Sequence, residues 1–341
     1  MCAVRVLYGG LPSVCAEGIL IMQIISLKNS ADTVPQGAVW VLGFFDGVHP
    51  GHKKLLREAV CTAEALGGGK TLPVAVWSFT SLPKADVLLT TREEAARILG
   101  DCGAQWLVLA DFAEVSHLEG PAFFREHLRD AFSPAAIVCG FNFHFGCGGR
   151  WNAADLVEMC KDAGIAVKIV DACVDEEGET ISSSRIRAQI QAGAMEKAVQ
   201  LLGSPYRITA PVEHGKKLGR TIGFPTINQR MPKGKVVPAQ GIYICRVSFR
   251  EENGALYDLP GVCNIGYRPT VNRDRADITL ETYILGYHGD LYGKEVQLSL
   301  YKKHRDEQKF PDVEVLSRQI AADAAAAQAY FSDRKGEEPC F

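Results

Sequence analysis

The stretch Val39-Trp-Val-Leu-Gly-Phe-Phe-Asp46-Gly-Val-His49-Pro-Gly-His52 opens as an apolar run and ends with two histidines around Pro50-Gly51. The following residues, Lys53–Val60, read as the first turns of a helix. A buried strand, a glycine turn and a helix N-terminus together form an anion site, because free backbone N–H groups and the helix dipole attract negative charge. The two histidines would add ring donors beside the anion. The alternative is an ordinary strand–turn–helix whose histidines only cap and solvate the chain.

The composition is that of a soluble globular protein with room for two domains. The 341 residues are 47% hydrophobic and 23% charged, with a formal net charge of −3. This balance argues against a protein that coats nucleic acid or an anionic membrane, so any anion site is local. The apolar runs are too short for a membrane span. Eleven scattered cysteines without a Cys-x-x-Cys pair favour reduced thiols and a cytoplasmic protein.

Short apolar runs alternate with helical patterns over residues 22–202, which we expect to form the first domain. The runs are Val39–Phe45, Pro73–Phe79, Trp106–Ala110, Ala136–Cys139 and Ile165–Val170, and the helical patterns are His52–Leu66, Arg92–Leu99, Pro121–Phe132 and Asn152–Ala163. This alternation predicts a parallel sheet covered on both faces, with ligands beyond the carboxyl ends of its strands. We expect residues 1–21 to be an extension, disordered or the product of a misassigned start, with Met22 as the true start.

After Leu202 the pattern changes to short alternating runs. They are Ser204–His214, Gly241–Arg250, Leu259–Ile265, Ile278–Leu285 and Glu295–Tyr301, separated by Gly, Pro, Asn and Asp. Such runs are typical of an antiparallel barrel or sandwich. A final helix is expected from Pro311 to about Phe331, with one apolar face formed by Val313, Leu316, Ile320 and Ala324. The second domain would span residues 203–333, followed by a frayed tail at 334–341.

Two further clusters in the first half suggest ligand binding. In Gly140–Gly149, glycines allow close backbone approach, and Asn142 can both donate and accept hydrogen bonds. In Ile181–Arg187, serines precede a helix and arginines follow in its first turns. Hydroxyls, helix N–H groups and guanidinium forks together make a polyphosphate clamp. The alternatives are a glycine-rich turn in the first cluster, and N-caps with a solvated face in the second.

Phe45–His52 and Ile181–Arg187 together resemble the adenylyltransferase half of the bacterial bifunctional riboflavin kinase/FAD synthetase family. The resemblance implies a Rossmann-like nucleotidyltransferase domain that joins FMN to the AMP part of ATP and releases pyrophosphate. It also implies that His49 and His52 bind ATP phosphates and stabilise the transition state, and that Ser183 and Arg187 hold the β- and γ-phosphates. By the same resemblance, the nucleotide site includes Phe45, Asp46, Gly47, Gly51, Asn142 and Ser184.

Two segments depart from the family pattern. The family usually carries a histidine in the loop that here reads Ser78–Lys84, which contains none. The segment Arg150–Asp155 also lacks the usual Gly-Asp pair. These differences leave the phosphate residues intact and concern the contacts on the flavin side.

In the second half, Gly215–Asn228 combines three glycines and three basic residues with the ending Pro225-Thr226-Ile-Asn228. Pro225 fixes the chain, so Thr226 and Asn228 point the same way along a strand. A hydroxyl and an amide oxygen suit Mg²⁺, which prefers oxygen ligands and keeps several waters. Glu281 interrupts an apolar strand, and a kinase acting on a hydroxyl needs such a carboxylate to accept the proton. The alternatives are a basic surface hairpin and the solvent face of an edge strand.

This half resembles the riboflavin kinase module of the same family, through Gly215–Asn228, Gly241–Tyr243, Gly261–Thr270, Leu291–Val296 and Tyr301–Phe310. The resemblance implies a six-stranded β-barrel with a C-terminal helix. It implies that Thr226 and Asn228 coordinate Mg²⁺ and ATP phosphates and that Glu281 is the general base. The nucleotide would be covered by a loop that includes Gly215, Gly219, Gly223 and Pro225.

The leading hypothesis is therefore a bifunctional enzyme that converts riboflavin and ATP to FMN, then FMN and ATP to FAD, with Mg²⁺ in both steps. We expect a monomer or weak homo-oligomer with small-molecule substrates and neither nucleic-acid nor membrane partners. One alternative is a riboflavin kinase whose nucleotidyltransferase half is weak or altered. Another is a flavin-binding regulator without chemistry, which the presence of Glu281, Asn228 and both histidines opposes.

Overall fold

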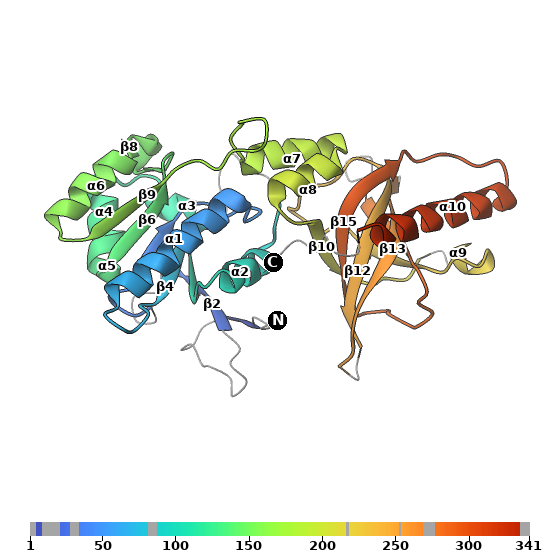
Figure 1. Ribbon diagram of the computed structural model, residues 1–341, viewed down its shortest axis with the longest axis horizontal. Coiled ribbons are helices and arrows are strands. Elements are labelled where there is room, and N and C mark those ends of the chain that lie inside the picture. Colours follow the sequence, from blue (N-terminus) through green and yellow to red (C-terminus); the bar gives the residue numbers. More distant parts are fainter. Residues whose placement is uncertain are drawn as a thin grey trace. The chain divides into compact units, whose positions relative to one another are not determined.

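The computed structural model describes residues 5–8, 21–27, 34–80, 87–215, 218–251, 254–268 and 277–334. The chain divides into two compact units, Met1–Ser183 and Ser184–Phe341, coloured from blue to green and from yellow-green to red in Figure 1. Within the described ranges, no helix has the length and apolar character needed to cross a membrane.

A parallel sheet of seven strands forms the centre of the first unit, in the order β1-β2-β5-β4-β3-β6-β9. The strands are β1 (Arg5–Tyr8), β2 (Ile21–Ser26), β3 (Val39–Leu42), β4 (Val74–Phe79), β5 (Trp106–Ala110), β6 (Ala136–Gly140) and β9 (Ala166–Val170). All neighbouring pairs are parallel, which confirms the predicted α/β class. The start at Met22 stays a prediction, because most of the first twenty residues lie outside the described ranges.

Helices cover both faces of this sheet because successive strand side chains point to opposite sides (Figure 1). Val39 and Val41 of β3 pack with α1 (Pro50–Leu66) and α2 (Arg92–Asp101). Trp40 and Leu42 pack on the other face. The helices on that face are α3 (Phe112–Val115), α4 (Gly120–Phe124), α5 (Asp130–Phe132) and α6 (Ala153–Asp162). The predicted helix over 121–132 is present, with a π-helical turn at Arg125–Arg129 between α4 and α5.

The strand order reverses between β3 and β6. From β3 the chain moves to β4 and β5 on one side, and then returns to β6 and β9 on the other. In open parallel sheets, ligands bind beyond the carboxyl ends of the strands at such a switch point. The histidine turn follows β3, and Gly140–Gly149 follows β6, so both predicted clusters lie at this edge.

The segment Arg150–Asp155, which departs from the family pattern, packs through the side chain of Trp151. Strands β7 (His144–Phe145) and β8 (Trp151–Asn152) form a short hairpin. The Trp151 ring lies against Gly120 and Gly146, where a Cβ on either glycine would overlap it. Asn152 caps α6 through the backbone N–H groups of its first turn. In this chain, therefore, Trp151 and Asn152 have structural roles in the hairpin and the following helix.

The second unit contains an antiparallel sheet of six strands in the order β10-β15-β12-β13-β14-β11. The strands are β10 (Tyr206–Pro211), β11 (Thr226–Arg230), β12 (Gly241–Arg250), β13 (Leu256–Arg268), β14 (Asp277–Ile284) and β15 (Glu295–Arg305). The first and last strands in this order also meet, because the Glu213 amide donates to the Asn228 carbonyl at 2.7 Å. The buried Gln229 amide adds a bond to the Ala210 carbonyl at 2.6 Å. The sheet thus curls into the predicted barrel.

Two helices precede the barrel, α7 (Ser183–Ala192) and α8 (Met195–Leu202), and α8 packs on β10 and β15. The division between units falls at the start of α7 and groups both helices with the barrel. The sequence-based boundary at residues 202/203 stays a prediction.

A final helix, α10 (Val313–Ser332), packs on the outer face of the barrel, where Ala327 contacts the layer of Ile242, Ile244 and Val262. The predicted apolar face of this helix is wrong in detail. Val313 is 52% exposed, whereas the buried positions are Ala327 and Asp323. Asp323 is buried because Arg305, at the end of β15, reaches the helix and donates three hydrogen bonds to its carboxylate.

Candidate active sites

The turn after β3 has a constrained backbone. Gly47 and Val48 both have positive φ angles, +83° and +41°. A left-handed φ is costly for a β-branched residue such as Val48, about 1–3 kcal/mol, and persists where the surroundings enforce it. Val48 is buried, and the next residue, His49, is the N-cap of α1. The turn therefore sets both histidines at the first turn of a 17-residue helix that has no acidic residue there.

The two imidazoles stack on each other and are buried. Their ring centroids lie 3.8 Å apart at 23°, and the His52 ring also packs against Phe45. Gly51 makes room for this arrangement, because a Cβ there would lie 3.1 Å from His49 Cε1. Both Nδ1 atoms are buried and have no hydrogen-bond partner within the described parts of the chain. The pair therefore offers two unused ring nitrogens.

Burial also decides the charge of this pair. It lowers the pKa of His49 to about 4. The pKa of His52 is lowered well below its usual value, first by burial and second by the proximity of His49. Both rings are consequently neutral near pH 7 when the site is empty. A bound anion would raise both pKa values, because opposite charge favours the protonated form.

Asp46 fixes the turn through hydrogen bonds of its carboxylate. Its side chain is 3% exposed, and Oδ1 accepts hydrogen bonds from the amides of Leu89 at 2.6 Å and Thr90 at 3.2 Å. The Thr90 side chain also contacts the turn, because its Oγ1 accepts a hydrogen bond from the Gly47 amide at 3.1 Å. Asp46 and Gly47 thus join the histidine turn to the segment that precedes α2.

The structure brings most of the predicted nucleotide residues to one edge of the sheet. Ser183 lies on the turn, where its Oγ donates to the Asp46 carbonyl at 2.9 Å. Asn142 follows the neighbouring strand β6, and its Oδ1 lies close to Gly140. Ser184 and Arg187 follow on α7 and belong to the second unit.

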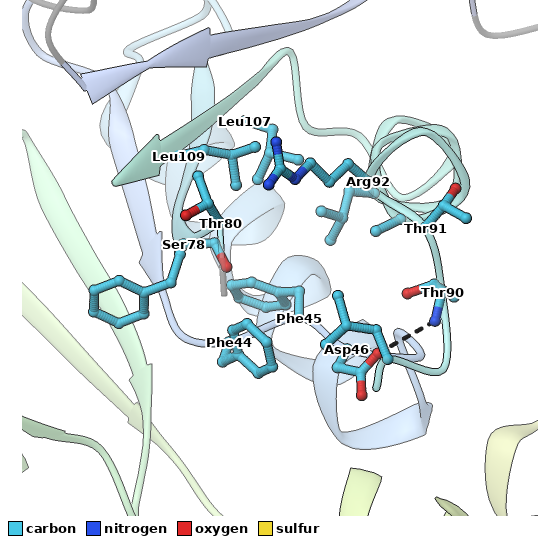
Figure 2. A pocket seen from close by; sticks show the side chains of 14 residues that line it. Phe44, Phe45, Asp46, Ser78, Thr80, Thr90, Thr91, Arg92, Leu107 and Leu109 are labelled. Atoms are coloured by element: carbon cyan, nitrogen blue, oxygen red, sulfur yellow. Dashed lines mark hydrogen bonds between the residues drawn. The ribbon is translucent and has the colours of Figure 1, made fainter. Parts of the chain in front are cut away.

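A pocket adjoins the histidine turn at the carboxyl ends of β4 and β5 (Figure 2). Its apolar lining comes from Phe44, Phe45, Phe79, Leu88, Ala95, Leu99, Leu107 and Leu109. Polar side chains complete it, namely Asp46, Ser78, Thr80, Thr90, Thr91 and Arg92. In Figure 2 the Arg92 side chain extends over Leu107 and Leu109. Of the departing loop Ser78–Lys84, residues from 81 onward lie outside the described ranges.

The barrel places its predicted catalytic residues by strand pairing. Asn228 of β11 lies directly opposite Glu281 of β14, and Thr226 lies opposite Tyr283. Alternate residues of these strands, such as Gln229 and Thr282, are buried in the interior. Thr226, Asn228 and Glu281 therefore share the outer face of the barrel, where each is half-buried.

Glycines of the connection before β11 lie close to this face. A Cβ on Gly215 would overlap the Asn228 amide, and a Cβ on Gly219 would overlap the Phe224 carbonyl. Gly223 has a φ of +84°, which ends the short helix α9 (Leu218–Thr221) in a turn. Lys216 and Lys217 lie outside the described ranges. Next to Thr226, a second pocket is lined by Arg220, Pro225 and the segment 287–292.

The residues of this face fit a magnesium ion that accompanies a nucleotide. Thr226 supplies a hydroxyl and Asn228 an amide oxygen on the same side of one strand. Gly215 leaves space directly beside the amide. Mg²⁺ accepts such neutral oxygen ligands and completes its shell with water and phosphate oxygens.

Some residues at these sites were not found from the sequence. Thr90 was missed, although the capping-box pattern Thr91-Arg-Glu-Glu94 beside it was readable. Asn264 lies opposite Glu281 on the other neighbouring strand. Only the strand register reveals that position, because no local pattern marks it.

Comparisons with known proteins agree with this geometry. A family model described as FAD synthetase matches residues 31–185, and one described as riboflavin kinase matches residues 202–331. Two relatives are named bifunctional riboflavin kinase/FMN adenylyltransferase. The Listeria monocytogenes protein is 36% identical over 86% of this chain and 92% of its own length. The Escherichia coli K12 protein is 34% identical over 90% of this chain and 97% of its own.

One solved structure is similar along almost its whole length. It is a crystal structure from Streptococcus pneumoniae, named a macrolide-efflux protein, with 32% identity and a TM-score of 0.80. The match covers 89% of this chain and 98% of that one. The two family models and the near-complete coverage of the relatives show that this chain belongs to the bifunctional riboflavin kinase/FMN adenylyltransferase family.

Proposed function

We propose that the chain makes FAD in two steps at two separate sites. The barrel transfers the γ-phosphoryl group of ATP to riboflavin, giving FMN and ADP. The α/β unit then transfers the AMP part of a second ATP to FMN, giving FAD and pyrophosphate. The observation that carries this proposal is the pair of sites: a buried histidine stack at a helix N-terminus, and Glu281 opposite Asn228 on the barrel.

In the adenylyltransferase step, an oxygen of the FMN phosphate attacks the α-phosphorus of ATP, and the bond to pyrophosphate breaks. The nucleophile is already anionic, so the protein needs to align the reactants and balance the charge of the leaving group. His49 and His52 meet both needs, because their unused ring nitrogens lie where the dipole of α1 already favours an anion. We assign Ser183, Ser184, Arg187 and Asn142 to the same nucleotide.

We place the flavin ring of FMN in the pocket beside this turn (Figure 2). The apolar lining suits a planar aromatic ring, while hydroxyls and Arg92 can meet its polar edge. The absence of a histidine from Ser78–Lys84 does not remove this pocket, because most of its lining comes from Phe44–Asp46 after β3, from β5, and from α2 with the segment before it.

In the kinase step, Glu281 accepts the proton of the terminal riboflavin hydroxyl as its oxygen attacks the γ-phosphorus and the bond to ADP breaks. The pairing of β11 with β14 supports this role, because it places the carboxylate beside Asn228. Thr226 and Asn228 would hold Mg²⁺, which neutralises charge on the phosphate oxygens when it is bound. We place the nucleotide along the Gly215–Gly223 connection and the adjoining pocket.

We place the enzyme in the cytoplasm, acting as a monomer or weak homo-oligomer without nucleic-acid partners. The eight cysteines in the described ranges are all free thiols, which supports a reducing compartment.

Purified protein incubated with riboflavin, ATP and Mg²⁺, followed by separation of the flavins, tests both halves. We expect FMN to form first and FAD to follow. No FMN from riboflavin would refute the kinase assignment. FMN that never proceeds to FAD would instead support the alternative of a kinase with an altered nucleotidyltransferase half. The matches of both halves to separate family models favour the bifunctional enzyme.

A further inference from the structure

A second amide lies beside Glu281 on the outer face of the barrel. Pairing of β13 with β14 sets Asn264 directly opposite Glu281, just as pairing of β11 with β14 sets Asn228 opposite it. Directly opposite residues share a face and lie within reach of each other. The carboxylate is therefore flanked on its two sides by Asn228 and Asn264.

The Asn264 amide is bonded on one side only. Its Nδ2 donates to Glu307 Oε1 at 3.3 Å. Its Oδ1 is buried and has no hydrogen-bond partner within the described ranges. An ionised Glu281 cannot supply a donor, because a carboxylate only accepts. A buried acceptor without a donor destabilises the empty protein, so its presence beside a catalytic carboxylate indicates that a ligand brings the donor.

The orientation of this amide is set by the end of the barrel. Arg305 donates to the buried Asp323 of α10 at 3.0 and 2.7 Å. Its third nitrogen donates to the Asp306 carbonyl at 3.0 Å, and its guanidinium lies over the Phe310 ring. The connection that carries Glu307 is thus held near both of its ends. Glu307 in turn keeps the Asn264 Nδ2 on its own side and leaves Oδ1 for a ligand.

We propose that Asn264 is a positioning residue for the acceptor substrate, with Oδ1 accepting a hydrogen bond from a hydroxyl of the riboflavin polyol chain. That hydroxyl lies next to the one that gives its proton to Glu281. A polyol fits because it carries several donors in a row, whereas phosphate oxygens would be repelled by Oδ1. The inference rests on the proposed kinase function and deepens it by naming the part of the substrate that is recognised.

The test is steady-state kinetics of FMN formation by the full chain carrying Asn264→Leu, which keeps the volume and removes both polar atoms. We expect the KM for riboflavin to rise about tenfold, in line with loss of one hydrogen bond. The kcat and the KM for ATP should stay within about twofold, because neither Glu281 nor the nucleotide residues are changed. The retained kcat and KM for ATP report that the barrel is folded, and FAD formation from supplied FMN reports that the other unit is unaffected.

A matched pair at Glu307 tests the orienting contact. Glu307→Gln keeps an oxygen for the Asn264 Nδ2 and should leave the KM for riboflavin near that of the wild type, whereas Glu307→Ala should raise it several-fold. Asp306→Asn is the control, because that exposed carboxylate pairs with Lys303 and not with Asn264.

An unchanged riboflavin KM in Asn264→Leu would overturn the inference, as would a loss confined to kcat. If Asn264→Leu loses both activities through misfolding, the two variants of the exposed Glu307 provide the test. Equal KM values for riboflavin in Glu307→Gln and Glu307→Ala would then overturn the inference. A wild type that makes no FMN would instead refute the kinase function itself, before any variant is compared.

Discussion

The two proposed active sites of this chain are built in different ways. The α/β site is local: one turn between β3 and α1 carries both histidines, and a single strained backbone segment sets their geometry. The barrel site is non-local, because Asn228, Asn264 and Glu281 come from three strands and meet only through register. The first site is thus sensitive to changes in one turn, whereas the second is sensitive to anything that alters strand pairing.

The two sites also differ in how they handle charge. The histidines are buried and neutral until an anion arrives, so the empty site carries no buried charge that would need a partner. Glu281 is half-buried on an outer face, where water can solvate the carboxylate before substrate binds. The proposed polyphosphate site thus buries its polar groups, whereas the proposed hydroxyl site keeps its carboxylate within reach of water.

The largest effect is expected from Glu281→Gln, which keeps the shape of the side chain and removes the base. FMN formation should fall by about 10²–10⁴-fold. FAD formation from supplied FMN should persist, because the adenylyltransferase site uses other residues. Separation of the flavins measures both in one sample. Loss of both activities in a variant that is still folded would contradict two independent sites.

The opposite pattern, loss of FAD formation with FMN formation retained, is expected from His52→Asn. This change removes one member of the stacked pair, and FAD formation from supplied FMN should fall by about 10²–10³-fold, as for loss of one charge-stabilising donor. FMN formation from riboflavin should remain as in the wild type, and circular dichroism together with thermal unfolding of the variant checks that the α/β unit is still folded. Retention of full FAD formation would mean that the histidines only cap and solvate α1.

Two glycines test the contrast between local and non-local construction. Gly215→Ala puts a Cβ into the Asn228 amide, and FMN formation should fall by at least about tenfold, because we propose that this amide holds Mg²⁺. Gly51→Ala puts a Cβ 3.1 Å from the His49 ring, where a small shift relieves the contact, so FAD formation should fall only several-fold. Gly215→Ala should leave FAD formation unchanged, and Gly51→Ala should leave FMN formation unchanged. Loss of FAD formation in the first variant or of FMN formation in the second would contradict the assignment of these glycines.

The smallest effect concerns stability and pH. Unfolded histidine takes up a proton near pH 6.5, whereas folded His49 does so only near pH 4, so the unfolded state binds more protons between these values. The free energy of unfolding is therefore highest above pH 6.5 and falls as the pH drops toward 4. The contribution of His49 is at most about 1.4 kcal/mol per pH unit.

Urea unfolding of His49→Asn at pH 7 and at pH 5 measures this contribution. The variant should lose less stability than the wild type over this interval, because its side chain does not titrate. His117→Asn, which changes an exposed histidine, is the control and should follow the wild type. An equal loss in His49→Asn and in the wild type would mean that His49 is not buried in solution.

Much of this protein is determined by local sequence patterns. Apolar runs separated by helical segments predicted the parallel sheet, and alternating runs predicted the barrel, because burial on two faces or on one face leaves different periodicities. The histidine turn and the Pro225-Thr-Ile-Asn228 ending were also readable, because their chemistry depends on neighbours in the chain.

Only the tertiary structure decided the rest. Register placed Asn264 beside Glu281, since pairing depends on how six strands close into a barrel. Burial made the two histidines neutral, and no residue type by itself reports burial. The partner of Asp46 lies on the segment before α2, and the buried partner of Arg305 lies on the last helix, against the apolar pattern of that helix. Each of these features depends on contacts between distant parts of the chain, which local patterns do not encode.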